Sequence, residues 1–322
     1  MMSGKPVLWI SRRLSPNTEA RAARDYEVLL NPEDTLNSSE KIIAMSHLVD
    51  AILPCHSEIF DAGVVSRMGK RTRIVANHSV GVDHCDLEAF RNRGIVVTNT
   101  PDVLSDATAE IAMLLLLGAA RKAVEGDRLV RTGQWSHWSP SFLVGHQVTG
   151  KRLGILGLGK VGRVMAQRAR GFGMEVHYHN RSRLSPDLEQ DAIYHENLHS
   201  LLGVSRFLSL HCPATPETAG ILNRETISKL PDGAIVVNTA RGALVDESAL
   251  LDAVASGKIA GAGLDCFATE PGGNPAFSAH ENIFMLPHIG SATLDTRDAM
   301  GFRALDNLDA FFAGNEPRDR VA

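Results

Sequence analysis

The chain has 322 residues, of which 44% are hydrophobic and 22% are charged, and its formal net charge is −4 at pH 7. This length indicates two domains, because single hydrophobic cores stop growing at about 250–300 residues. The acidic balance gives no global attraction for nucleic acids or anionic membranes, so a small anion has to be bound by local positive charge.

The first hundred residues alternate short apolar runs with amphipathic segments, as is typical of α/β units. Strands are expected at residues 7–10, 51–54, 73–76 and 95–98, with helices between them. A long helix is expected at 106–122, and its apolar run is much shorter than the ~20 residues that span a bilayer. The N-terminal segment has no secretory pattern, so we expect a cytoplasmic protein. The four cysteines are scattered without metal-ligand spacing, which predicts reduced thiols and no metal site.

A more regular series of strands follows, expected at residues 153–156, 176–179, 207–211, 235–239, 262–265 and 283–287. Six strands with intervening helices match the strand count of a doubly wound nucleotide-binding sheet. The last helix, expected at 295–313, is predicted to return to the first domain. The sequence therefore predicts an α/β protein with two doubly wound parallel sheets.

A glycine-rich loop lies between the first strand of this series and a helical pattern at residues 163–172. The loop is Gly157, Leu158, Gly159, Lys160, Val161 and Gly162, a G-x-G-x-x-G motif in the strand–turn–helix context that a dinucleotide site requires. Gly157 permits the tight turn, Gly159 lets the backbone approach a pyrophosphate, and Gly162 allows close helix packing. The N–H groups at the helix start can then bind the phosphates.

The residue that ends the second strand of this series indicates which nucleotide is bound. An NAD site normally has an Asp or Glu about 20 residues into the unit, whereas this chain has Asn180. Arg181 and Arg183 can pair with a 2′-phosphate, and the Ser182 hydroxyl can add a hydrogen bond. NADP is therefore favoured as the cofactor, with NAD as the alternative.

Three segments late in the chain each have a polar residue just after an expected strand: Arg241, Glu270 and His288. Ligands of open α/β sheets bind beyond the carboxyl ends of the strands, so these side chains are expected to converge. Reduction of a 2-keto acid needs a cation for the carboxylate, which Arg241 supplies, and a proton donor, which His288 supplies. Glu270 would orient the imidazole and favour its protonated form. Asp265 is a candidate for orienting the nicotinamide carboxamide.

Nearly the whole chain resembles the D-isomer-specific 2-hydroxyacid dehydrogenase family. The resemblance is carried by GLGKVGRVMAQRARGFGMEV, by VVNTARGALVDESALLDAVASGKIAGAGLDCFATEP and by MLPHIGSAT. It implies a Rossmann cofactor domain, residues 101–290, inserted in a split flavodoxin-like substrate domain, residues 1–100 and 291–322. An active site in a cleft between the two domains is expected from the family.

The resemblance also implies roles for individual residues. Arg241, Glu270 and His288 occupy catalytic positions, and Asp265 occupies a cofactor position. Backbone N–H groups of Val80 and Gly81 are expected to bind the substrate carboxylate, and Ser291 follows the catalytic histidine as a further substrate contact. The remaining cofactor contacts expected from the family are Thr108, His211, Cys212, Pro213, Thr239, Ala240 and Gly290.

Within the family, the chain looks most similar to NADPH-dependent glyoxylate/hydroxypyruvate reductases. In that group a tryptophan near Trp138 reaches the active site of the partner subunit, so Trp138 is a candidate substrate contact in an expected homodimer; an interface or core role for it is an alternative. Glu270 argues against formate dehydrogenases, which have glutamine there. Reduction of a larger keto-sugar acid such as 2-ketogluconate is a second reading. A non-catalytic NAD(P)-sensing protein is a third, because fold alone does not establish catalysis.

Overall fold

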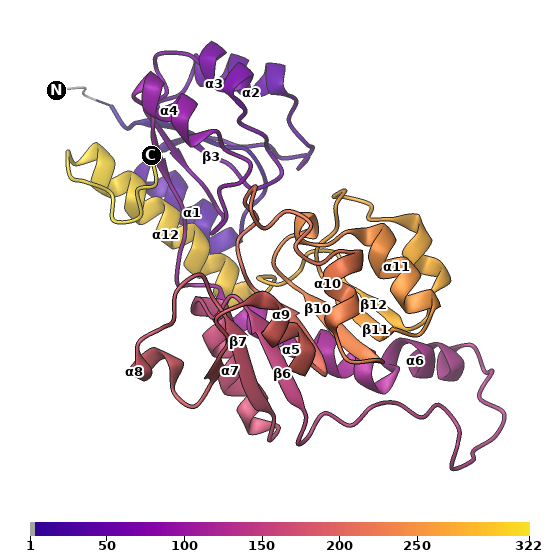
Figure 1. The fold of residues 1–322 in the computed structure, drawn as a ribbon. Coiled ribbons are helices and arrows are strands. Elements are labelled where there is room, and N and C mark those ends of the chain that lie inside the picture. Colours follow the sequence, from indigo (N-terminus) through magenta and orange to yellow (C-terminus); the bar gives the residue numbers. More distant parts are fainter. Residues whose placement is uncertain (1–3) are drawn as a thin grey trace. The chain divides into compact units, whose positions relative to one another are not determined.

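The computed structural model describes residues 4–322, which form two compact units (Figure 1). Unit 1 comprises residues 4–104 and 292–322, and unit 2 comprises residues 105–291. From the sequence, domain boundaries were expected at residues 100 and 291. Across residues 4–322, no helix combines the length and the apolar character needed to cross a membrane.

Unit 1 contains a five-stranded, wholly parallel sheet in the order β2-β1-β3-β4-β5. This is the flavodoxin-like strand order. The strands are β1 (Val7–Ile10), β2 (Glu27–Leu29), β3 (Ala51–Leu53), β4 (Ile74–Ala76) and β5 (Val96–Thr98). The edge strand β2 was not expected from the sequence, because it has only three residues and none of them is fully buried.

Five helices cover the two faces of this sheet. Each begins after a Ser, Asp or Thr whose side-chain oxygen accepts a backbone N–H of the first turn, which offsets the unsatisfied donors there. They are α1 (Pro16–Asp25), α2 (Ser39–Ser46), α3 (Ala62–Arg67), α4 (Leu87–Arg93) and α12 (Leu294–Phe312). Although α12 comes from the end of the chain, it packs on α1 and β4.

The C-terminal segment completes unit 1 at the edge strand β5. The N–H of Val97 donates to the carbonyl of Ala322 at 3.0 Å, and the N–H of Val321 donates back to Val97 at 2.8 Å. The buried Asp319 accepts from Arg303 of α12 at 2.8 Å and from Asn307 at 3.0 Å. Side-chain and backbone bonds together therefore fasten the last residues to the sheet.

Unit 2 contains a seven-stranded parallel sheet in the order β12-β11-β10-β9-β6-β7-β8. Counted from β6, this is the Rossmann order with one strand added beyond the sixth. The strands are β6 (Arg152–Leu156), β7 (Glu175–His179), β8 (Ile193–Tyr194), β9 (Phe207–Leu210), β10 (Ala234–Asn238), β11 (Ile259–Leu264) and β12 (Ile283–Met285). Six of these seven strands were predicted from the sequence, and the one that was not predicted is the two-residue strand β8. The expected α/β class with two doubly wound parallel sheets is confirmed.

The helices of unit 2 lie on both faces of its sheet (Figure 1). The most buried is α5, whose small residues allow close packing on α7 and β11. Residues 132–151 form an extended segment without helix or strand. The helices are α5 (Ser105–Arg121), α6 (Ala123–Arg131), α7 (Lys160–Gly171), α8 (Pro186–Glu189), α9 (Leu198–Val204), α10 (Arg224–Lys229) and α11 (Glu247–Ala255), with short 3-10 turns η1 (Gly242–Leu244) and η2 (Pro275–Ala279).

Candidate active site

Three neighbouring strands of unit 2 deliver the proposed catalytic residues. Strands β10, β11 and β12 pair in parallel, with Asn238 opposite Leu264 and Leu264 opposite Met285. The carboxyl ends of the strands therefore lie at one edge of the sheet. The segments with Arg241, Glu270 and His288 all follow these ends, which is where ligands of open α/β sheets bind.

His288 and Glu270 form a hydrogen-bonded pair, with 2.6 Å between Nδ1 and Oε2. About a quarter of each side chain is exposed. The other carboxylate oxygen, Oε1, accepts the backbone N–H of Phe267 at 2.8 Å, which fixes the direction of the carboxylate. An ionised carboxylate can only accept, so Nδ1 carries a proton and Nε2 is the ring nitrogen that can exchange one with a substrate.

The loop that presents His288 is fastened by Asp265, which is 1% exposed. Its two oxygens accept the N–H groups of Ile289 at 2.8 Å and Gly290 at 2.7 Å. Burial raises the pKa of Asp265, although these two backbone bonds act in the opposite direction. His288 itself has a φ of 53°, in the left-handed region that non-glycine residues rarely adopt. Asp265 thus holds a strained turn, a function that the sequence did not reveal.

A buried asparagine that sequence reasoning missed shapes the turn around Arg241. Asn238 ends β10, and its side-chain amide donates to the carbonyl of Arg241 at 2.8 Å while its oxygen accepts the N–H of Ala240 at 3.0 Å. The guanidinium of Arg241 donates to the carbonyl of Ala240 at 2.8 Å. The only signal in the sequence was an amide side chain at the end of an apolar strand.

The glycine loop has the shape that a dinucleotide pyrophosphate requires. Gly157 has a φ of 98°, and a Cβ there would lie 2.6 Å from the backbone nitrogen of Cys212. A Cβ at Gly162 would lie 2.3 Å from the carbonyl oxygen of Gly157. At Gly159, by contrast, no atom of the described residues beyond its own local stretch of backbone lies within 4 Å of the Cβ position, and α7 begins there without a side-chain cap. The helix start therefore offers open space and N–H donors to an anion.

The end of β7 is occupied by Asn180 rather than by an acid, and its Oδ1 accepts the N–H of Leu158 at 2.7 Å. Asn180 thus braces the glycine loop. Arg183 pairs with the buried Glu189, with 2.9 Å between Nε and Oε2. Arg181 and Ser182 are exposed, and Arg181 makes no ion pair within residues 4–322. Of the two arginines, Arg181 is the one not engaged by a carboxylate.

The remaining residues expected at the cofactor lie after strands β9, β10 and β12 or on α5. His211 donates to or accepts from Ser209 at 2.8 Å, and burial lowers the pKa of His211 to about 4. Burial raises the pKa of Cys212 to about 11. The hydroxyl of Thr239 is buried and has no hydrogen-bond partner in the described chain. An orphaned buried hydroxyl beside the site fits a missing ligand group.

The other expected site residues lie on α5, on the extended segment of unit 2 and in a loop of unit 1. Thr108 is buried on α5, 3.5 Å from where a Cβ of Gly290 would lie. Trp138 lies on the extended segment, is 75% exposed and makes no hydrogen bond within residues 4–322. In unit 1, the carbonyl of Val80 accepts from Asn99 at 2.8 Å and that of Gly81 accepts from Ser79 at 2.7 Å. With their carbonyls held in this way, Val80 and Gly81 form an ordered loop.

Comparisons with known proteins agree with this arrangement. Residues 113–290 match the family model for the NAD binding domain of D-isomer specific 2-hydroxyacid dehydrogenases. The chain is 43% identical to a glycerate dehydrogenase of Hyphomicrobium methylovorum, over 97% of this chain and 98% of that one. It is 40% identical to a glyoxylate reductase of Pyrococcus furiosus, over 97% and 94%.

A similar solved structure is that of an NADPH-dependent glyoxylate/hydroxypyruvate reductase from Sinorhizobium meliloti in complex with NADP and malonate. The TM-score is 0.87 at 31% identity, over 99% of this chain and 97% of that one. The glycine loop, the strand-end side chains and the full-length similarity support one assignment. The chain belongs to the D-isomer specific 2-hydroxyacid dehydrogenase family.

Proposed function

We propose that this enzyme reduces a small 2-keto acid, glyoxylate or hydroxypyruvate, to the 2-hydroxy acid with NADPH as the preferred reductant. The observation that carries the proposal is the hydrogen-bonded pair of His288 and Glu270 at the strand ends that also deliver Arg241. The relatives named glyoxylate reductase and glycerate dehydrogenase support a substrate of two or three carbons.

In the proposed mechanism, Arg241 holds the substrate carboxylate, because a guanidinium provides a planar fork of donors that matches two carboxylate oxygens. His288 delivers a proton from Nε2 to the carbonyl oxygen as the alkoxide develops. Glu270 keeps the ring in this orientation and compensates the positive charge that the ring carries before transfer. A bound reduced nicotinamide supplies the hydride for the carbonyl carbon.

Residues of unit 2 fit the nicotinamide dinucleotide. The N-terminus of α7 and Gly159 would hold the pyrophosphate, and the hydroxyl of Thr239 would gain a partner. The absence of an acid at Asn180 supports NADPH, because an acid there would repel a 2′-phosphate. We assign the 2′-phosphate to Arg181, since Arg183 is engaged by Glu189.

We also propose a homodimer in which Trp138 lies at the interface. Trp138 is 75% exposed, and Val130, Trp135 and Val144 in the same stretch of chain are each more than half exposed. Exposed apolar side chains gathered in one segment are typical of protein–protein contacts. An interface of this kind would bury them.

A reductase panel tests the proposed function directly. Glyoxylate, hydroxypyruvate, pyruvate and 2-ketogluconate would each be reduced with NADPH and with NADH, and kcat/KM would be compared. The proposal predicts the highest values for glyoxylate or hydroxypyruvate with NADPH. A preference for 2-ketogluconate would favour the larger keto-sugar acid. Nucleotide binding without turnover of any keto acid would instead identify a nucleotide sensor.

A further inference from the structure

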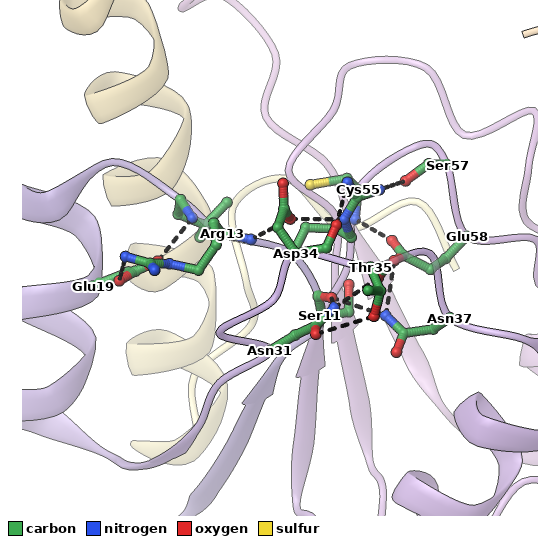
Figure 2. Close-up of polar contacts among 12 residues, drawn as sticks. Ser11, Arg13, Glu19, Asn31, Asp34, Thr35, Asn37, Cys55, Ser57 and Glu58 are labelled. Atoms are coloured by element: carbon green, nitrogen blue, oxygen red, sulfur yellow. Dashed lines mark hydrogen bonds and ion pairs between the residues drawn. The ribbon is translucent and has the colours of Figure 1, made fainter. Parts of the chain in front are cut away.

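Three histidines gather at one edge of the unit 2 sheet, where β7 pairs with β8. His177 and His179 lie two residues apart on β7, and so on the same face of the strand, and His195 directly follows β8. An ion pair of arginine and carboxylate, such as Arg13 with Glu19 at 2.8 Å in unit 1 (Figure 2), keeps its charges across neutral pH. A group of histidine rings can instead gain or lose a proton there.

A chain of hydrogen bonds runs through two of these rings. His177 Nε2 lies 2.6 Å from Glu175 Oε1, and His177 Nδ1 lies 2.9 Å from His195 Nε2. His195 Nδ1 lies 3.1 Å from the hydroxyl oxygen of Ser200, and that hydroxyl donates to the carbonyl of Asn197 at 2.9 Å. His177 is 5% exposed, so its ring depends on these protein partners rather than on water.

The directions of these bonds fix the number of protons in the chain. An ionised carboxylate can only accept, so Nε2 of His177 carries a proton. The Ser200 hydroxyl has one hydrogen, which it gives to Asn197, so it accepts from Nδ1 of His195. The bond between the two rings needs a third proton. Because two neutral imidazoles carry only two protons, the pair holds one extra proton and one positive charge.

The surroundings of the pair favour one positive charge and oppose a second. The hydrogen bond from His177 lowers the pKa of Glu175, which keeps this carboxylate ionised as the counterion. Arg152 Nε also lies 3.2 Å from Glu175 Oε1. Burial lowers the pKa of His195, and the rings of His177 and His179 act in the same direction. When the extra proton leaves at higher pH, one hydrogen bond of the chain is lost.

His195 also binds β7 through its backbone. Its N–H donates to the carbonyl of Tyr178 at 2.8 Å, and its carbonyl accepts from Nδ1 of His179 at 2.8 Å. With the ring contact to His177, it therefore contacts three consecutive residues of β7. Since β8 itself has only two residues, much of the hold on this edge of β7 comes from His195.

The end of β7 in turn holds the glycine loop. The N–H of Gly157 donates to the carbonyl of His179 at 3.0 Å, and the N–H of Leu158 donates to Oδ1 of Asn180 at 2.7 Å. The loop that would take the pyrophosphate is therefore bonded to the same stretch of strand that His195 contacts.

We propose that the proton shared by His177 and His195 positions the glycine loop for the dinucleotide, so that nucleotide affinity falls when the pair loses this proton. With the proton present, every bond of the chain is made and the end of β7 is held. Without it, one bond is lost and the edge of the strand loosens. Both histidines are positioning residues that act through β7. The inference rests on the nucleotide site of the proposed function, but not on the keto acid or on the preference for NADPH.

The test measures the Kd of NADH for the full chain by the fluorescence of the bound nucleotide, from about pH 5.5 to 9, a range that includes the ordinary pKa of histidine. NADH is chosen because it lacks the 2′-phosphate, whose own ionisation near about pH 6 would add a second transition. The Kd is expected to rise by about two- to tenfold with increasing pH, the worth of one hydrogen bond. A Kd that stays constant over this range would overturn the proposal.

His195→Gln keeps hydrogen-bonding groups at this position but cannot titrate, so it should abolish the rise in Kd. The matched control is His199→Gln on α9, because His199 is exposed and its ring faces Glu225. This control should retain the rise. Any contribution of His288 is common to both variants and cancels in the comparison. Equal pH profiles in the two variants would contradict the assignment to His195.

Glu175→Gln tests the pair without altering either ring, and it keeps the proposal testable if His195→Gln does not fold. Removing the counterion destabilises the shared positive charge, so the rise in Kd should move to lower pH. A merely structural role of Glu175 would change the Kd without moving the midpoint, and an unmoved midpoint would therefore refute the inference. The expected pH profile without turnover of any keto acid would refute the proposed function alone. NADPH-dependent reduction with a flat profile would refute this inference alone.

Discussion

His288 and Glu270 lie eighteen residues apart in the chain, yet Nδ1 and Oε2 are 2.6 Å from one another. The pair is built from two loops that follow adjacent strands, and each loop has its own backbone anchor. Asp265 fastens the loop of His288, and the N–H of Phe267 fastens the carboxylate of Glu270. The geometry is therefore set before a substrate binds, which removes ordering cost from the reaction.

Replacing His288 by alanine removes the proposed proton donor. Loss of a general acid typically costs about 10²–10⁴-fold in rate, so kcat for glyoxylate should fall by that factor while the nucleotide Kd stays unchanged. Glu270→Gln retains a hydrogen-bond acceptor but removes the charge, and we expect a smaller fall in kcat. Stopped-flow and steady-state rates measure both effects. Wild-type turnover in His288→Ala would remove this residue from the mechanism.

Arg241→Lys keeps the charge but removes the planar fork. A lysine cannot form two parallel hydrogen bonds to a carboxylate, so KM for the keto acid should rise by about tenfold or more. The KM for the nucleotide is the internal control and should not change. If the variant has wild-type KM and kcat for glyoxylate, the carboxylate is bound elsewhere.

Arg181→Ala should raise the KM for NADPH much more than the KM for NADH, because only NADPH carries the 2′-phosphate. Arg183→Ala is the matched comparison, because it removes the same charge two residues further along the chain. Arg183, unlike Arg181, is paired with Glu189. We expect it to have the weaker effect on NADPH. The ratio of the two KM values is the quantity to measure, and equal changes for both nucleotides would contradict the assignment.

Asp319→Asn should destabilise unit 1. Burial alone would raise the pKa of Asp319, but the bonds from Arg303 and Asn307 outweigh it and hold the pKa below its ordinary value. Removing one partner of a buried ion pair costs on the order of 3 kcal/mol. Urea unfolding followed by the emission of Trp9, which is buried in unit 1, measures the loss.

The difference in free energy of unfolding between wild type and Asp319→Asn should depend on pH with a definite sign. A carboxylate with a lowered pKa stabilises the folded state above its ordinary pKa near 4, and this contribution is lost as the pH falls through the folded value. The gap between wild type and Asp319→Asn should therefore be constant from about pH 8 to 5 and shrink below about pH 4. The exposed pair of Glu316 and Arg320 is the control, where Glu316→Gln should cost less than ~1 kcal/mol.

Trp138→Ser tests the proposed interface. If Trp138 is buried between subunits, its loss should shift the equilibrium toward monomer, and light scattering after size-exclusion chromatography would detect this at low concentration. Leu36→Ser is the control, because Leu36 is 57% exposed in unit 1, far along the chain from this segment. A dimer of equal stability in both variants would place the interface elsewhere.

The sequence predicted the elements that have strong periodicity. Strand β1 was expected at its observed bounds, and the α5 and α12 helices were expected within one residue of theirs. Strands β2 and β8 were not expected, because two or three residues at a sheet edge give no alternating pattern. Their pairing depends on the neighbouring strands, which is a tertiary effect.

The candidate site shows a similar division. Its chemically reactive side chains could be predicted, because a strand-end position and a residue type are both visible in the sequence. The groups that hold these side chains in place could not be predicted from the sequence. Asn238 acts through bonds to the backbone of its own turn, and Asp265 through bonds to the backbone of the loop after β12. The pairing of Arg183 with Glu189 depends on how α8 folds back. Such contacts depend on loop conformations that leave no periodic pattern in the sequence.

The closure of unit 1 by the end of the chain has a consequence for biosynthesis. Residues 105–291 are contiguous and can fold as they leave the ribosome, whereas residues 4–104 must wait for α12 and the segment that pairs with Val97. At about 5–20 residues per second, that wait is roughly 10 to 40 seconds. During this time the β5 edge and the sheet face beneath α12 are exposed, which leaves the nascent N-terminal third prone to aggregation.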